Sequence, residues 1–466
     1  MRKLAVLISL LIITGCSKQP TAPEFSISET APGGGMTTKQ LSNRSFIYPG
    51  PAADKMTQLQ FWTGFSLFRD PWVIAPSSTK DRDGLGPLFN TRSCVSCHDA
   101  GSRGKLPEAG EVIPQALVIR LGSTDENNKS VDPVYGGQIQ PRAINVFHKT
   151  KENRAKAEAW LNIQINHIAG TFADGTAYSL TKPDYELTRM AHGDLASHIA
   201  LSPRHAPNVF GMGLLDAIKK EDLLAQEDPN GDGISGVYNR VPNQLTGETE
   251  IGRFGFKAKH PNLHQQVAAA FRDDIGITSE LFPEESCTQV QADCTEVAKL
   301  GGHDGVEIPD KLLNLVTTFS QLLAVQPARN LNTKTKLAGR ELFYQLDCQG
   351  CHTPSYTTDP NYPVESLANQ TIWPYTDLAL HDMGPELADG VYEFEAKGTE
   401  WRTPPLWGIG LQQEYTGQQR YLHDGRARTI EEAILWHGGE AKASQQQYIK
   451  LSRTQRQQLL SFLRSI

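Results

Sequence analysis

The chain has 466 residues, of which 39% are hydrophobic, and its formal net charge is −7 at pH 7. This length is too great for one small domain and is sufficient for two or three units, each with its own core. The acidic balance argues against a nucleic-acid-binding protein, which would carry a surplus of Lys and Arg.

The first fifteen residues have the composition of a signal peptide. Arg2 and Lys3 precede an apolar run over residues 4–13, and small residues follow. Ile13-Thr14-Gly15-Cys16 resembles the lipobox of bacterial lipoproteins, in which the Cys becomes the acylated N-terminus. Because Ser17 and not Asp follows, we expect an outer-membrane anchor facing the periplasm. An ordinary cleaved signal, with Cys16 unmodified, is the alternative.

Residues 16–45 have the composition of a linker. They contain three prolines and the run Gly33-Gly34-Gly35, which predicts a flexible tether between the lipid and the folded protein. Later in the chain there is no stretch of eighteen consecutive apolar residues. We therefore expect a protein that is anchored to a membrane and does not span it.

Two Cys-x-x-Cys-His pentapeptides follow, Cys94-Val95-Ser96-Cys97-His98 and Cys348-Gln349-Gly350-Cys351-His352. This spacing attaches a haem through two thioethers and supplies the His as an axial iron ligand. A zinc site would need two further ligands nearby, and a thiol redox pair leaves the His unexplained. The sequence therefore predicts two covalently bound c-type haems, with His98 and His352 as proximal ligands.

An internal repeat accompanies these pentapeptides. Gly64-Phe65-Ser66-Leu67-Phe68 precedes the first and Gly339-Arg340-Glu341-Leu342-Phe343 precedes the second. This shared Gly-x-x-Leu-Phe motif is predicted to lie on a helix that leads into each haem loop. Each half closes with an amphipathic helix, over residues 312–323 and 453–463. This order is typical of a c-type cytochrome domain. We expect a mainly α protein with two cytochrome c-like domains, residues 46–328 and 329–466.

The first domain contains extra chain at about residues 108–250. Residues 116–119 form an apolar run, residues 160–168 alternate between apolar and polar, and Ala173-Asp174-Gly175 has the composition of a hairpin turn. These patterns predict an insertion with β-hairpins, packed on the first domain over its haem.

Asp228-Pro229-Asn230-Gly231-Asp232-Gly233 has oxygen side chains at alternate positions and a Gly at the sixth, as a calcium-binding loop begins. Asp228, Asn230 and Asp232 are the candidate ligands. The closing Glu of an EF-hand is replaced by Asn239, so an ion-free turn stabilised by Asx side chains is the alternative.

Cys287 and Cys294 belong to neither pentapeptide. Six residues separate them, and the oxidising compartment that a signal peptide implies favours a disulfide between them.

Several motifs together resemble the di-haem oxidoreductase family, whose members are labelled as peroxidases or thiol oxidoreductases. The resemblance runs from about residue 55 to the C-terminus. Its motifs are Asp83-Gly84-Leu85-Gly86-Pro87-Leu88-Phe89-Asn90, Gly211-Met212-Gly213-Leu214-Leu215, Leu380-His381-Asp382-Met383-Gly384-Pro385, Trp401-Arg402-Thr403-Pro404-Pro405-Leu406-Trp407 and Tyr421-Leu422-His423-Asp424-Gly425-Arg426-Ala427. Thiol chemistry is not expected, because haem attachment consumes the four Cys-x-x-Cys thiols.

More remotely, the layout resembles bacterial di-haem cytochrome c peroxidases and the related enzyme that matures tryptophan-derived quinones. This resemblance implies that a small donor protein, a cytochrome c or a cupredoxin, reduces the second haem and that hydrogen peroxide reacts at the first. It also adds support for calcium, which those peroxidases hold between their haems. A non-catalytic di-haem electron carrier is the alternative function.

The same resemblance implies the catalytic groups. Leu263-His264-Gln265-Gln266-Val267 is similar to the helix that carries a catalytic Gln, which places Gln266 at that position. Asp274 falls near the position of the catalytic Glu, although it is shorter by one methylene. His264 or Gln265 could reach the iron instead, and an ordinary amphipathic helix with a polar face is the bland alternative.

The sixth ligand of the second iron should come from the loop before the closing helix. His437 lies in that loop, whereas Met383, its rival, comes early for this topology. For the first iron the sequence leaves four candidates open: His192, His198, His205 and Met212. Among the motif residues, Trp407 is a candidate electron relay, and Trp401, His381 and His423 are expected to pack around a haem.

Overall fold

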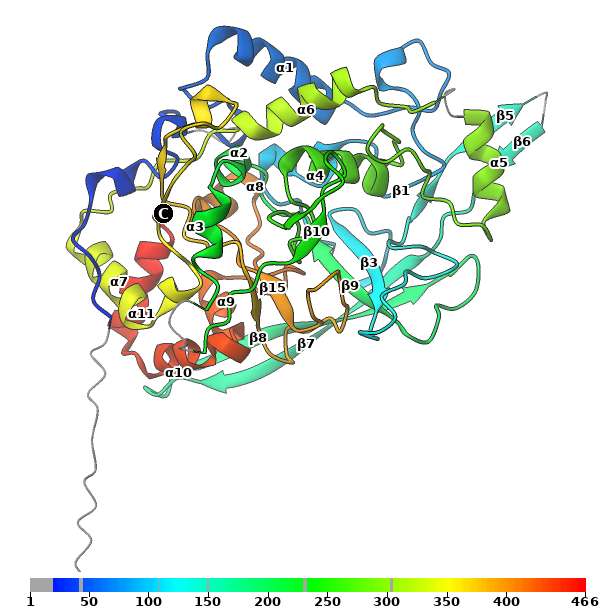
Figure 1. Ribbon diagram of the computed structural model, residues 1–466. Helices are drawn as coiled ribbons and strands as arrows, with labels where there is room; N and C mark the ends of the chain where they lie inside the picture. The colour runs from blue at the N-terminus through cyan, green and yellow to red at the C-terminus, as the bar shows by residue number, and fades with distance from the viewer. Residues whose placement is uncertain (1–19, 42–44, 108, 149–150, 229–232, 302–304) are drawn as a thin grey trace, which may run out of the picture.

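The computed structural model describes residues 20–41, 45–107, 109–148, 151–228, 233–301 and 305–466 (Figure 1). The predicted signal peptide and Cys16 lie outside these ranges. Helices hold 31% of the residues and strands hold 20%. The expectation of a mainly α protein is therefore wrong. Its cause is physical: the inserted segment alternates in polarity and pairs into ribbons, and short two-stranded sheets recur in the loops of both halves.

In the first half, α1 (Lys55–Arg69) crosses α6 (Asp310–Leu322). The Asp54 carboxylate caps α1 by accepting backbone N–H groups of its first turn. At the crossing, a Cβ atom on Gly64 would lie 2.0 Å from the carbonyl oxygen of Leu315. Only a residue without a side chain permits this approach of the two helices.

The second half repeats the crossing with α7 (Lys334–Gln345) and α11 (Arg453–Leu463). A Cβ atom on Gly339 would lie 2.1 Å from the carbonyl oxygen of Gln458. Both Gly-x-x-Leu-Phe motifs thus lie on helices, as predicted, and the Gly of each one marks the closest approach to the closing helix.

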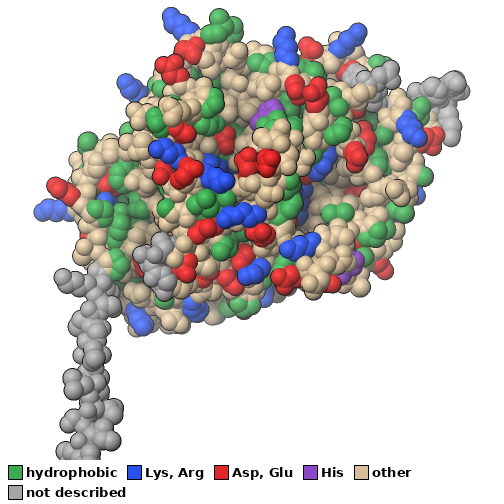
Figure 2. Space-filling view, viewed as in Figure 1, with side chains coloured by type: hydrophobic (Ala, Val, Ile, Leu, Met, Phe, Trp, Pro, Cys, Tyr) green, Lys and Arg blue, Asp and Glu red, His purple; other side chains and the backbone are tan. Residues whose placement is uncertain are grey.

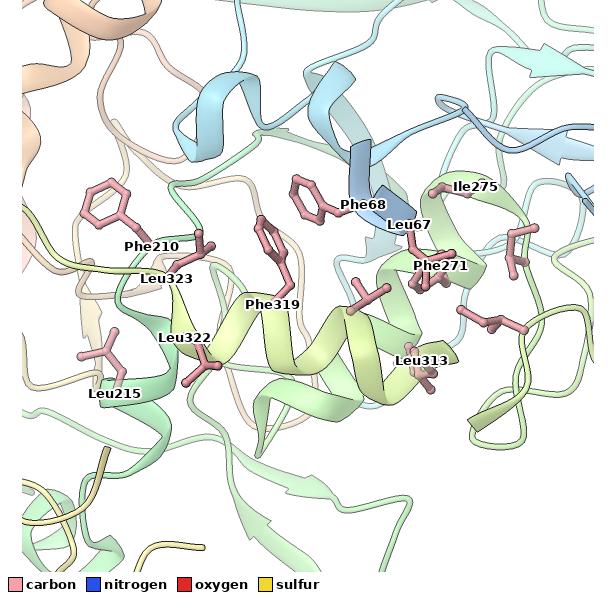
Figure 3. Close-up of a cluster of buried hydrophobic side chains, with 14 of the residues drawn as sticks. Leu67, Phe68, Phe210, Leu215, Phe271, Ile275, Leu313, Phe319, Leu322 and Leu323 are labelled. Carbon is pink, nitrogen blue, oxygen red and sulfur yellow. The ribbon is translucent and has the colours of Figure 1, made fainter. Parts of the chain in front are cut away.

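Aromatic rings complete each crossing. The rings of Phe68 and Phe319 have centroids 4.8 Å apart, and those of Phe343 and Phe462 have centroids 5.7 Å apart. Figure 3 shows Phe68 and Phe319 facing each other between α1 and α6, within the larger cluster of buried apolar side chains. This packing explains why the repeat ends in Phe.

The inserted segment forms two ribbons. β3 (Leu117–Ser123) pairs antiparallel with β9 (Ile199–His205), and β2 (Gly110–Val112), β7 (Trp160–Thr171) and β8 (Ala177–Thr188) form a three-stranded antiparallel sheet. Leu117, Ile119 and Leu121 alternate to one face and pack in a small core of the insertion itself.

The hairpin of β7 and β8 turns at Ala173-Asp174-Gly175, as predicted, with Gly175 at φ +83°. Its tip reaches the C-terminal half: Phe172 belongs to the second hydrophobic cluster, and Asp174 pairs with Arg456 at 3.0 Å. The insertion, expected to pack on the first domain, thus also contacts the C-terminal half (Figure 1).

The described part of the segment predicted as a flexible tether packs against the folded protein. Glu29 is 1% exposed, and its carboxylate binds Arg340 of α7 through two bonds of 2.8 and 2.9 Å. Thr38 donates its backbone N–H to the carbonyl of Val325 at 2.9 Å. A buried, bidentate ion pair fixes this segment along the seam between the halves.

The hydrophobic clusters do not follow the order of the chain. The larger cluster, built on α1 and α6, also contains Tyr356, Leu378 and Trp407 of the C-terminal half. The smaller cluster, built on α7 and α11, contains Phe172 and Leu180 of the insertion. Each hydrophobic cluster therefore contains side chains from both sides of residues 328/329. The domain boundary at this point stays a prediction.

Shorter elements connect these units. The helices are α2 (Met212–Asp216), α3 (Lys220–Leu224), α4 (Leu263–Ala270), α5 (Ala292–Gly301), α8 (Gln412–Thr416), α9 (Ile430–Trp436) and α10 (Lys442–Lys450). The strand pairs are β1 (Leu88–Phe89) with β4 (Arg142–Ala143), β5 (Asn145–His148) with β6 (Lys151–Arg154), β10 (Arg240–Pro242) with β11 (Thr249–Ile251), β12 (Tyr356–Thr357) with β13 (Thr371–Ile372), and β14 (Leu380–Asp382) with β15 (Glu400–Arg402).

Cys287 and Cys294 form a disulfide, which ties the start of α5 to the preceding loop. Among the described residues, the structure contains no helix with the length and apolarity needed to cross a bilayer. On the face shown in Figure 2, acidic and basic side chains are interspersed.

Candidate active site

Both pentapeptides line one large cavity between the halves of the chain. The first begins with the single 3-10 turn η5 (Cys94–Ser96) and the second with η8 (Cys348–Gly350). Each turn follows the crossing helix of its half, so the repeated helix presents its cysteines and its His to the same interior space. The lining includes Cys94, Cys97, His98, Cys348, Cys351 and His352.

The two pentapeptide histidines have equivalent surroundings. Nδ1 of His98 lies 2.8 Å from the carbonyl oxygen of Pro207, and Nδ1 of His352 lies 3.0 Å from that of Tyr375. Burial lowers the pKa of each imidazole to about 4. A neutral ring whose Nδ1–H donates to a carbonyl leaves Nε2 as a bare donor atom for iron.

His437 follows α9 and lines the cavity opposite His352. Its Nδ1 lies 2.8 Å from the carbonyl oxygen of Ala433, so its Nε2 is also left bare. The ring centroids of His437 and His352 are 6.5 Å apart. With a metal–nitrogen bond of about 2.0 Å and about 1.1 Å from Nε2 to the ring centre, two axial imidazoles have centroids about 6.2 Å apart. Met383, the rival ligand, lines the same cavity.

The equivalent position in the first half holds a small residue. α4 and α9 both begin after a side-chain cap, Asn262 in the first half and Thr429 in the second. When the two caps are aligned, Ala270 occupies the position in the first half that His437 occupies in the second. Both residues line the cavity. A methyl group cannot bind iron, so Ala270 cannot supply the first half with a counterpart of the His437 imidazole.

Gln266 and Asp274 line the cavity with Cys94 and Cys97. Oε1 of Gln266 is buried and has no hydrogen-bond partner among the described residues. Asp274 lies on the π-turn η7 (Phe271–Ile275), which continues α4. Burial raises the pKa of Asp274 above its ordinary value, although Arg120 and a hydrogen bond from Gln138 oppose this shift. The structure therefore brings together an amide and a carboxyl group beside the first pentapeptide.

The two neighbouring candidates on α4 point elsewhere. Nδ1 of His264 lies 3.0 Å from Oγ1 of Thr317 on α6. The side chain of Gln265 bonds to the chain at Pro242 and Gln244. Of the three polar residues on this helix, Gln266 is the one that lines the cavity.

Cationic side chains also line the cavity. Burial lowers the pKa of Lys259 to about 8 and that of Arg402 to about 10. Arg120 pairs with Asp273 at 2.6 Å. A haem carries two propionate carboxylates, which buried cations of this kind can bind. Neutral imidazoles, thiols at the attachment spacing, apolar walls and buried cations together fit two haems.

A family model described as "Di-haem oxidoreductase, putative peroxidase" matches residues 27–466. This match covers nearly the whole chain.

The chain belongs to the di-haem oxidoreductase family. The resemblance seen in its motifs is therefore confirmed. The comparison with curated proteins gives no match. Among solved structures, Kuenenia stuttgartiensis hydrazine synthase, pressurised with xenon, shares 18% identity over 39% of this chain and 63% of its own, with a TM-score of 0.24. A likeness this low carries no argument about fold or function.

In this di-haem oxidoreductase, Trp401 and not Trp407 lines the cavity. The Trp401 ring stacks on His423 with centroids 3.8 Å apart and an interplanar angle of 7°. Trp407 is buried in the larger hydrophobic cluster, against Gly211. The electron relay expected at Trp407 stays a prediction, and Trp401 is the indole of this motif that lines the cavity.

His381 lies between two carboxylates, 2.8 Å from Asp377 and 2.8 Å from Glu440. Despite burial, hydrogen bonds to these groups and to Cys351 raise its pKa to about 12. These two carboxylates therefore favour the protonated imidazole of His381, beside Cys351 of the second pentapeptide.

Of the four candidates for the sixth ligand of the first iron, Met212 lines the cavity. The Nε2 atom of His205 binds the carbonyl oxygen of Gly104, and that of His198 lies 3.3 Å from Ser130. For calcium, Asp228 is described and exposed, whereas Asn230 and Asp232 lie outside the described residues. The calcium site stays a prediction.

Sequence reasoning missed Gln138, Arg120 and Lys259. Pairing or packing between distant segments brings Arg120 and Lys259 to the cavity and Gln138 to Asp274, so no local motif marks them. The one local signal is the spacing of Gln138 and Gln140, because side chains two residues apart in an extended segment point to the same face.

Proposed function

We propose that this di-haem oxidoreductase is a c-type cytochrome peroxidase that faces the periplasm. A small donor protein, a reduced cytochrome c or cupredoxin, delivers electrons to the C-terminal haem, and hydrogen peroxide reacts at the N-terminal haem. The observation that carries the proposal is the position of Gln266 and Asp274 beside Cys94 and Cys97, where Ala270 replaces the ligand residue of the other half.

The net reaction consumes one hydrogen peroxide, two electrons and two protons and yields two water molecules. When bound, the N-terminal haem would supply a redox-active iron for the reduction of peroxide. Asp274 acts as the acid–base group: its carboxylate accepts the proton of one peroxide oxygen and returns it to the oxygen that departs as water. The Gln266 amide, whose Oε1 lacks a protein partner, orients the peroxide by hydrogen bonding.

We assign the residues that hold the haems as follows. Cys94 and Cys97 attach the N-terminal haem and Cys348 and Cys351 attach the other; these are the four cysteines outside the disulfide in the described chain. His98 and His352 are the proximal ligands, and His437 is the sixth ligand of the second iron. Two imidazole ligands give a lower potential than His with Met. The stacked indole of Trp401 is the proposed relay.

The location and the calcium ion belong to the same proposal. An acylated Cys16 would tether the protein to the outer membrane, and the described chain begins to pack near residue 22 along the seam between the halves. Calcium would bind at Asp228, Asn230 and Asp232, next to Ser235, which bonds to Glu440.

The experiment is to measure the ferric spin state of each haem by electron paramagnetic resonance, together with peroxide turnover. A high-spin N-terminal haem and turnover with a reduced small cytochrome or copper protein would support the peroxidase. Two low-spin haems in every redox state, without turnover, would favour the alternative, a di-haem electron carrier.

A further inference from the structure

The π-turn that carries Asp274 is held by two glutamines from the insertion. Nε2 of Gln138 donates to the carbonyl oxygen of Asp273 at 2.8 Å and to Oδ1 of Asp274 at 2.9 Å. Nε2 of Gln140 donates to the same Asp273 carbonyl. Both glutamines are nearly fully buried. The turn therefore receives its side-chain hydrogen bonds from a segment more than 130 residues away.

The glutamines are themselves fixed in place. Gln138 forms a β-bridge with Arg120 of β3, and Arg120 pairs with Asp273 on the turn at 2.6 Å. Gln140 donates its backbone N–H to Glu158 at 2.5 Å, and Glu158 also accepts a hydrogen bond from Gln291. The backbone of each glutamine is therefore tied to the insertion, and its side-chain amide reaches the turn from there.

The two glutamines differ in one respect. The side-chain amide of Gln140 donates to a backbone carbonyl of the turn. The side-chain amide of Gln138 donates to the Asp274 carboxyl group as well. An N–H donor to a carboxylate oxygen stabilises the charged form and holds one side-chain orientation. With Oδ1 engaged, Oδ2 is the oxygen available for a proton.

We propose that Gln138 is a positioning residue for Asp274: its amide orients the carboxyl group toward the cavity and stabilises the ionised form, which can accept a proton. This inference rests on the proposed function, because it gives Asp274 the acid–base role. It adds that the insertion, which belongs to neither repeat, is part of the peroxide site.

Other charges near Asp274 must be considered in a test that varies pH. Arg120 of β3 and Lys259 of the loop before α4 favour the carboxylate, and Asp273 of the same turn opposes it. Cys94 and Cys97 of the η5 turn also lie within electrostatic range. These groups are the same in both variants described below, so their effect cancels in the comparison.

The test compares Gln138→Met with Gln140→Met in the holoprotein. Each variant keeps the length of the side chain and removes one amide, but only the first loses a bond to the carboxyl group. Ionisation of Asp274 is followed by an infrared carboxyl band that Asp274→Asn abolishes, and separately by the low-pH limb of the peroxide reaction rate.

We expect Gln138→Met to move the Asp274 titration and the low-pH limb upward by about one to two pH units, since hydrogen bonds to charged groups are worth that much. Gln140→Met should leave both in place. Equal shifts in the two variants, or no shift in either, would overturn the inference. If Gln138→Met loses haem, Gln138→Asn, which withdraws the amide by one methylene, should give the same upward shift.

The two measurements separate this inference from the proposed function. A shifted carboxyl titration in protein that never reacts with peroxide would support the role of Gln138 and contradict the peroxidase. Normal peroxide turnover with an unshifted titration in Gln138→Met would support the peroxidase and contradict the role of Gln138.

Discussion

The imidazole rings of His352 and His437 have centroids 6.5 Å apart and an interplanar angle of 42°. His352 belongs to the second pentapeptide and His437 ends a helix more than eighty residues later, yet both bare Nε2 atoms belong to rings that line the same cavity. We therefore propose that both imidazoles bind the iron of the C-terminal haem.

We expect His437→Met to raise the reduction potential of the C-terminal haem, because a thioether ligand favours the ferrous state relative to imidazole. Redox titration followed by optical spectra measures it, and a sulfur-to-iron band near the red edge should appear only in the variant. Met383→Leu is the control and should leave the potential unchanged. Such a band in the wild type, lost in Met383→Leu, would assign the ligand to Met383.

Haem stoichiometry should be two per chain. Cys97→Ala and Cys351→Ala should each lose one haem, because a single thioether retains haem poorly during maturation. Pyridine haemochrome spectra of purified protein measure this. Cys287→Ala, which breaks the disulfide instead, should keep both. A protein that binds zinc and no haem would contradict the assignment of both pentapeptides.

Asp274→Asn should lower peroxide turnover by about 10²–10⁴-fold, the usual effect of losing a general acid–base group, with both haems retained. Steady-state oxidation of a reduced small cytochrome measures the rate. Glu284→Gln removes an exposed carboxylate of the same region and should have no effect. Full turnover in both Asp274→Asn and Gln266→Ala would remove these residues from the mechanism.

Gly64→Ala should destabilise the protein by about 1–3 kcal/mol, since its new Cβ would meet the Leu315 carbonyl oxygen. In an exposed helix the same change would stabilise, because Ala favours helix more than Gly does. The sign of the change therefore tests the crossing. Denaturant unfolding measures it, with Thr63→Ala, an exposed neighbour on α1, as the control.

The stability that Glu158 contributes should fall as pH rises. Burial raises the pKa of Glu158 to about 8, from an ordinary value of 4.5. A raised pKa in the folded state means that the contribution is complete below about pH 4.5 and is lost as pH rises toward about 8. Unfolding of wild type and Glu158→Gln at pH 5 and pH 8 measures the difference, which should shrink at the higher pH. A constant difference would show that Glu158 has no raised pKa.

The sequence predicted well wherever a feature depends on neighbouring residues. The helices of both Gly-x-x-Leu-Phe motifs and the turn at Ala173-Asp174-Gly175 follow from local periodicity and turn chemistry, and the structure has them. The fold class was wrong because strand pairing depends on distant partners, as in the β3 and β9 ribbon. The predicted tether packs on the protein because Glu29 forms an ion pair with Arg340, which is distant in the sequence.

By itself, then, the sequence carried the prediction of covalent haem attachment: five consecutive residues suffice to propose each attachment and its proximal His, since no folding is needed to bring them together. Only the tertiary structure decided which side chains line the cavity beside each pentapeptide. It placed Ala270 where the second half has His437, selected Gln266 from three polar neighbours, and brought Gln138 to within 2.9 Å of Asp274. These relationships depend on packing between distant segments, which local residue patterns do not encode.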